Sequence, residues 1–165
     1  MFLRMTKKAR TKIKFDDSFL AIAPRKHGFL MEWYVNLFLL DGKRYFIFTE
    51  SLTLYSIVLD SKGINSLKEF RPVTPRIVAQ AIEECISGAR VEKVKLEDLE
   101  IGKTENRGVL GSQNDLIYLA QAQSWDSGTK DFQRINETPM SFLKYESPER
   151  EFRKKYGELE EEEIV

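Results

Sequence analysis

Residues 32–50, EWYVNLFLLDGKRYFIFTE, carry the clearest structural signal in the chain. Two runs of mainly aromatic and aliphatic residues flank Asp41-Gly42, a pair that favours a two-residue type I′ turn between antiparallel strands. In such a hairpin Leu40 lies opposite Lys43, and the pairing continues outward in a fixed register. We therefore predict that Leu37 and Phe46 are buried neighbours on adjacent strands.

The two faces of this hairpin differ in polarity. The first face is apolar and carries Val35, Leu37, Leu39, Phe46 and Phe48. The second face is mixed and carries Tyr34, Asn36, Phe38, Tyr45, Ile47 and Thr49. We expect the first face to contact the main core, and the second to be partly covered or available to a partner.

Two further stretches extend the predicted sheet. LTLYSIVLD, residues 52–60, is rich in β-branched and aromatic residues and predicts a third strand, and the N-terminal MFLRMT predicts another short one. The expected fold class is α+β, with an antiparallel sheet centred on the β-hairpin meander and packed by several α-helices.

We expect one domain of residues 1–157. The acidic run ELEEEEIV, residues 158–165, is expected to be a disordered tail, because its like charges bury little surface.

Helix signals flank the strands of the N-terminal half. KKARTKIKF follows the first strand and predicts a basic helix with Thr6 as its N-cap. VTPRIVAQAIEECISG predicts a second helix, with Thr74 as its N-cap, Pro75 at the first helical position and Gly88 as its stop. The apolar stripe of this helix includes Cys85, which we interpret as a small buried hydrophobe.

The C-terminal half alternates between short elements. RVEKVKLEDLEIGKT predicts one or two strands that end near Lys103, and a helix follows that runs to about Gln123. SWDSGTKD is expected to be a loop, and DFQRINETPM a short helix that ends near Asn136. A last helix is predicted from an N-cap at Ser147 to a stop at Gly157.

The composition excludes several classes of site. Lysine plus arginine equals aspartate plus glutamate in number, so no global charge favours nucleic acid or an anionic membrane. Cys85 is the single cysteine and His27 the single histidine, which excludes an internal disulfide, thiolate metal clusters and most zinc sites. There is no signal-peptide pattern and no apolar run long enough to span a bilayer. We expect a cytoplasmic protein with no cofactor, no metal and no membrane contact.

Residues 103–115, KTENRGVLGSQND, form a polar stretch marked by two glycines. Either Asn106 or Ser112 is the N-cap of the helix that starts here. Gly108 and Gly111 each disfavour a helix interior by about 1 kcal/mol, which close packing or the approach of a ligand would explain. A helix start also offers free N–H groups to an anion. The stretch is therefore a structural junction or a ligand site, whose candidate residues are Lys103, Thr104, Asn106, Arg107, Gly111, Ser112, Asn114 and Asp115.

The basic N-terminal helix is a second candidate site. Lys7, Lys8, Arg10 and Lys12 lie close together on it, and such a patch can contact phosphates. A solvated helix face is the alternative, and no aromatic residue is interleaved to stack on single-stranded bases.

Four segments carry a resemblance. FLRMTKKARTKIK, WYVNLFLLDGKRYFIFTESLTLYSIV, GKTENRGVLGSQNDL and NETPMSFLKYESP occur in this order. Together they resemble an uncharacterised bacterial family of about this length, a domain of unknown function marked by WYxNLF, KTxNRxVLGSxND and NxTPMSxLxY segments. The resemblance leads us to expect serine at position 108, where this chain has Gly108. It implies no activity.

The sequence favours binding over catalysis. No recognisable catalytic set is present, and one hairpin face is only half apolar. We expect an interaction or regulatory protein that is not an enzyme and whose partner is another protein. The alternatives are a nucleic-acid-associated protein that uses the basic helix, and a small enzyme that acts on an anionic ligand at Lys103–Asp115.

Overall fold

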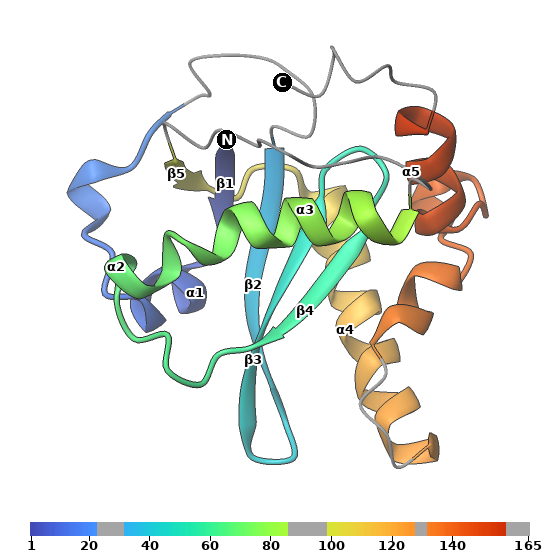
Figure 1. The fold of residues 1–165 in the computed structure, drawn as a ribbon, viewed down its shortest axis with the longest axis horizontal. Helices are drawn as coiled ribbons and strands as arrows, with labels where there is room; N and C mark the ends of the chain where they lie inside the picture. Colours follow the sequence, from blue (N-terminus) through green and yellow to red (C-terminus); the bar gives the residue numbers. More distant parts are fainter. Residues whose placement is uncertain (23–31, 86–98, 128–131, 158–165) are drawn as a thin grey trace.

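The computed structural model describes residues 1–22, 32–85, 99–127 and 132–157. Its centre is a five-stranded sheet with the order β4-β3-β2-β1-β5 (Figure 1). The strands are β1 (Phe2–Met5), β2 (Glu32–Leu40), β3 (Lys43–Glu50), β4 (Ser56–Asp60) and β5 (Glu100–Lys103). The expected combination of helices with a β-sheet is confirmed.

The predicted hairpin is confirmed in turn and register. Asp41 and Gly42 have φ values of 49° and 72°, as a type I′ turn requires, and Leu40 pairs with Lys43. Leu37 pairs with Phe46, as predicted. Phe46 is fully buried, whereas Leu37 is only half-buried because it lies at the margin of the core.

The sheet is mixed and not purely antiparallel, so that part of the prediction was wrong. β1 pairs in parallel with β2, Leu3 opposite Trp33, and also in parallel with β5, Leu3 opposite Ile101. Parallel neighbours need a crossover, and helix α1 (Lys7–Lys12) lies in the connection from β1 to β2. The meander prediction covered only strands joined by short turns, and it missed these long connections.

Both faces of the sheet are covered. One face packs against α1, α3 (Val73–Cys85) and α5 (Pro148–Tyr156), in a cluster that includes Val35, Phe46 and Phe48. Figure 1 shows α3 crossing the strands on this face. The mixed face packs against α4 (Arg107–Ser127) and the 3₁₀ segments η2 (Gln133–Glu137) and η3 (Ser141–Leu143). We call these groups the first cluster and the second cluster.

The second cluster accommodates polar atoms. Gln113 of α4 is fully buried, and its Nε2 donates to the carbonyl of Tyr34 at 3.1 Å and to the hydroxyl of Thr49 at 3.0 Å. The mixed composition of this hairpin face therefore reflects a second core with hydrogen bonds inside it.

Several predicted helix boundaries are confirmed and others differ, among them the end of α1, which stops at Lys12 and not at the end of KKARTKIKF. Thr6 and Ser147 cap α1 and α5, and α5 ends at Gly157. Helix α3 begins at Val73, because α2 (Leu67–Phe70) and a short turn lead straight into it; Thr74 lies inside the helix and is not its cap.

Helix α4 continues through residues 124–127, where a loop was expected. Cys85 is buried, as interpreted. His27, Gly88 and the acidic tail lie outside the described residues.

Candidate functional site

Asn106 is the N-cap of α4. Its Oδ1 accepts from the backbone N–H groups of Gly108 at 2.9 Å and Val109 at 3.2 Å. Its own backbone N–H donates to the Tyr34 hydroxyl at 3.1 Å, which ties the helix start to β2. Ser112 lies inside the helix and is buried, so the first of the two predicted cap positions is the correct one.

The two glycines of this stretch have different surroundings. A Cβ atom at Gly108 would lie 2.8 Å from Cε2 of Phe142, so the missing side chain lets η3 pack against α4. This contact accounts for glycine where the resemblance predicted serine. A Cβ atom at Gly111 would meet nothing within 4 Å. Close packing therefore explains only Gly108.

The polar stretch does not converge on one point. Lys103, Arg107, Asn114 and Asp115 are exposed, whereas Ser112 faces the core. Asp115 lies eight positions after Arg107 in the helix, which corresponds to about 12 Å along the axis. The exposed side chains are therefore spread from the end of β5 along α4, and the proposal of a ligand site at the start of α4 stays a prediction.

A buried arginine lies beside this helix start. Nε of Arg4 is 2.6 Å from Glu32, and its Nη1 is 2.8 Å from Glu105 and 3.2 Å from the carbonyl oxygen of Lys103. Burial opposes the charge of Arg4, but the two carboxylates outweigh it and raise its pKa. This cluster was missed from the sequence, although a lone arginine within an apolar strand indicates a paired buried charge.

Helix α1 has one structural and several exposed cations. Arg10 is buried, donates to the carbonyl of Met5 and forms a two-point contact with Asp17 at 2.8 and 3.2 Å. The hydrogen bonds from Arg10 lower the pKa of the Asp17 carboxyl. Arg10 is thus committed to the fold, whereas Lys7 and Lys8 are exposed.

A groove of about 940 Å³ lies between α1 and α4, and Asn114 is the one residue of the 103–115 stretch in its described lining. Its described lining comes from α1 and the residues just after it, the outer half of β2, Arg44, Asn65 and α4. The lining residues are Lys8, Thr11, Lys12, Lys14, Asn36, Leu37, Phe38, Leu39, Arg44, Asn65, Asn114, Ile117 and Gln121. Four of them are cations and none is a carboxylate, so we call it the basic groove.

The cations of the basic groove are little compensated. Nζ of Lys12 donates to Oδ1 of Asn65 at 2.6 Å. The N–H of Asn65 and, to a smaller extent, the charge of Lys12 lower the pKa of nearby Glu69. Within the described ranges, Lys8, Lys14 and Arg44 form no ion pair. The groove therefore keeps a positive field that an anion can neutralise.

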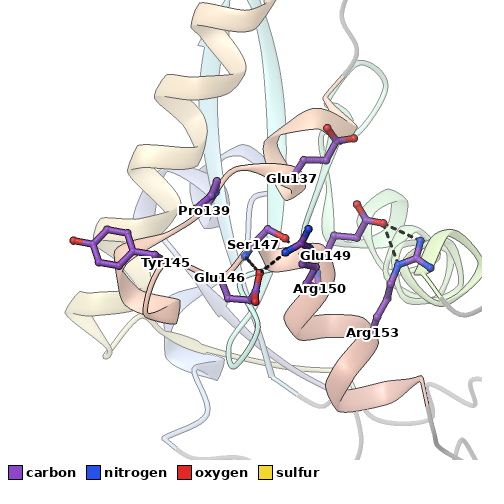
Figure 2. A pocket seen from close by; sticks show the side chains of 8 residues that line it. All are labelled: Glu137, Pro139, Tyr145, Glu146, Ser147, Glu149, Arg150 and Arg153. Atoms are coloured by element: carbon purple, nitrogen blue, oxygen red, sulfur yellow. Dashed lines mark hydrogen bonds and ion pairs between the residues drawn. The ribbon is translucent and has the colours of Figure 1, made fainter.

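Figure 2 shows a second pocket, of about 510 Å³, at the N-terminal end of α5. Its two arginines are paired with glutamates. Arg153 lies 2.8 Å from Glu149, and Arg150 lies 3.5 Å from Glu146. With both arginines occupied by carboxylates, this pocket is less suited to a charged ligand than the basic groove.

In the described part of the chain, no group of three or more histidine, cysteine, aspartate or glutamate residues is placed to hold a metal ion. Within the same ranges, no helix combines the length and apolar character needed to cross a membrane.

One comparison with known proteins found a match. A family model described as a domain of unknown function, DUF6933, matches residues 2–151. No curated protein and no solved structure matches the chain.

Proposed function

The chain belongs to the DUF6933 family, a domain of unknown function, and we propose that it is a non-enzymatic binding protein. Its basic groove holds an acidic segment of a partner protein. The observation that carries this proposal is a large groove with four cations and no carboxylate among its described lining residues. Complementary charge attracts such a segment and orients it.

The floor of the groove favours a polypeptide over a nucleic acid. Leu37, Leu39 and Ile117 supply apolar contact area between the cations and the amides. Phe38 is the one aromatic residue in the described lining, and its side chain is buried in the second cluster. Stacking of unpaired bases needs exposed aromatic faces. Aliphatic side chains of a peptide are a better match for this floor.

The proposal is tested by the anisotropy of a labelled peptide of alternating glutamate and valine, compared with a labelled oligothymidine of equal formal charge. We expect the peptide to bind more tightly and its binding to weaken with salt. The double variant Lys8→Glu with Lys14→Glu should lose about tenfold or more in affinity, because it reverses charge inside the groove.

The matched control is Lys144→Glu with Lys154→Glu, which changes the net charge equally at exposed positions outside the groove. It should leave peptide affinity nearly unchanged. Tighter binding of oligothymidine would instead support a nucleic-acid role. Equal losses in the two double variants would show that the groove is not the binding site.

A further inference from the structure

The outer half of β2 has a free edge. β1 pairs with β2 only from Phe2 opposite Glu32 to Met5 opposite Val35. β3 pairs with β2 as far as Leu40. Figure 1 shows the β2–β3 hairpin running on well beyond the end of β1. Among the described residues, no strand pairs with Asn36–Leu40 on the β1 side.

Two of the backbone groups at this edge are bonded to side chains. The last main-chain bond on this side runs from the N–H of Thr6 to the carbonyl of Val35, at 3.0 Å. Backbone groups alternate between the two neighbours of a strand, so those of Leu37 and Leu39 also point to the free edge. Leu37 donates to Oδ1 of Asn36 at 2.9 Å, and the carbonyl of Leu39 accepts from Nε2 of Gln121 at 2.9 Å.

Two amide side chains therefore occupy positions that a neighbouring strand would fill. The Asn36 oxygen stands in for a strand carbonyl, and the Gln121 nitrogen stands in for a strand N–H. In the described part of the chain, the carbonyl of Leu37 and the N–H of Leu39 have no hydrogen-bond partner. An incoming strand would satisfy these two groups.

The basic groove lies along this edge. The cations of the groove lie on the side of the first cluster. Arg44 is paired with Leu39 and shares its face, and the lysines belong to α1 and the residues after it, which pack on that face. Asn114, Ile117 and Gln121 of α4 line the opposite side.

The basic groove continues past Leu39 into a notch of about 480 Å³, which is lined by Leu39, Leu40, Tyr118 and Ala122 together with Asp41 and Gln121. Leu39 and Tyr118 are large side chains that are 57% and 71% exposed. The notch thus adds uncovered apolar surface to the same edge.

We infer that the partner segment binds as an added β-strand along Asn36–Leu40, with acidic side chains toward the lysines and apolar side chains toward Ile117 and Tyr118. This inference rests on the proposed function and names its partner as an extended, alternating acidic and apolar polypeptide. Addition to a sheet edge gives affinity through main-chain bonds and specificity through alternate side chains. The free edge has room for about five residues, or about 16 Å.

The opposing interpretation is that the lysines and amides only guard the edge against pairing with other chains. The two interpretations differ in whether the ligand backbone is used. In an added strand, every second N–H of the ligand faces β2, and the others face away. Contacts through side chains alone use neither set.

The test uses two N-methylated forms of the glutamate–valine peptide, one methylated at the valine amides and the other at the glutamate amides. Methylation at the set that faces β2 should cost about tenfold or more in affinity, and methylation at the other set should cost little. Equal affinities of the two forms, whether unchanged or both reduced, would overturn strand addition. The proposed function would survive that result if binding still depended on Lys8 and Lys14.

Amide hydrogen exchange gives a second readout. The N–H of Leu39 should exchange more slowly when the peptide is bound, because it acquires an acceptor. An unchanged exchange rate at Leu39 under saturating peptide would contradict strand addition. The Lys8→Glu, Lys14→Glu variant should lose peptide binding whether the peptide adds as a strand or binds through side chains alone. Retained binding in this variant would therefore show that the site is wrong, whereas an unchanged Leu39 exchange rate would show only that the binding mode is wrong.

Discussion

Gly108 and Gly111 occupy the same helix but perform different roles. Both have helical backbone conformations, so each costs about 1 kcal/mol relative to alanine. Only Gly108 makes space for a neighbour, the Phe142 ring of η3. The cost at Gly111 has no compensating contact in the described structure.

We predict that Gly111→Ala stabilises the protein by about 0.4–1 kcal/mol, because alanine restricts the unfolded chain and meets no obstruction. Gly108→Ala should stabilise less, or destabilise, since its Cβ must displace Phe142. Urea unfolding of the two variants measures the difference. Equal stabilisation would show that the Phe142 ring moves aside freely, and that Gly108 has no packing role.

Single residues were predictable where their partners are local. The caps Thr6 and Ser147 bind N–H groups three residues away, and the sequence identified both; at the start of α4 it narrowed the cap to Asn106 or Ser112. Buried charges were not predictable, because their partners are distant. Arg4 is an example: its Nε lies 2.6 Å from Glu32 and its Nη1 2.8 Å from Glu105, and both carboxylates belong to distant parts of the chain.

At the scale of elements, the start of α4 connects the second cluster to the sheet. Asn106 bonds two N–H groups of the helix and also reaches the Tyr34 hydroxyl through its own N–H. The polar stretch is therefore a structural junction, whatever binds beside it.

We predict that Asn106→Ala lowers the free energy of unfolding by about 0.5–2 kcal/mol, because two N–H groups of α4 lose their side-chain acceptor. Asn106→Asp should retain most of the stability, since a carboxylate accepts the same bonds and interacts well with the helix dipole. Thermal and urea unfolding provide the measurement. If the alanine and aspartate variants were equally destabilised, the carboxamide would be needed for something other than capping.

The hairpin and its antiparallel neighbour β4 were predictable from the sequence, and the parallel pairings of β1 were not. Asp41-Gly42 fixes the register of β2 and β3 within nineteen consecutive residues, 32–50. The positions of β1 and β5 depend on pairings about 30 and 98 residues apart, such as Leu3 with Trp33 and Leu3 with Ile101. No short-range pattern encodes such pairings. The basic groove and the free edge depend on them too, because they begin where β1 stops.

At the scale of the whole molecule, one sheet separates two clusters and belongs to both. In β3, Phe46 and Phe48 point into the first cluster, whereas Tyr45 and Ile47 point into the second. Neither cluster can form without β2 and β3. The mixed hairpin face, which the sequence left as partly covered or open, is therefore as much a part of the core as the apolar one.

We predict that the two clusters unfold in a single transition. Phe46→Ala should cost about 3–5 kcal/mol, because Phe46 is fully buried and packs against Phe48 and Phe70 at ring distances of 6.3 and 5.4 Å. Leu116→Ala, in the second cluster, should cost about 2–5 kcal/mol. Each variant should keep one calorimetric transition with equal calorimetric and van't Hoff enthalpies.

Amide exchange tests the same coupling locally. Either variant should speed exchange in both α3 and α4, since opening one cluster removes the sheet face that supports the other. Tyr118→Ala is the matched control on α4, because its side chain is exposed; it should change stability by no more than about 0.5 kcal/mol. If Leu116→Ala speeded amide exchange in α4 and left the amides of α3 protected, α4 would be an independently opening unit. The groove between α1 and α4 would then not be a rigid site.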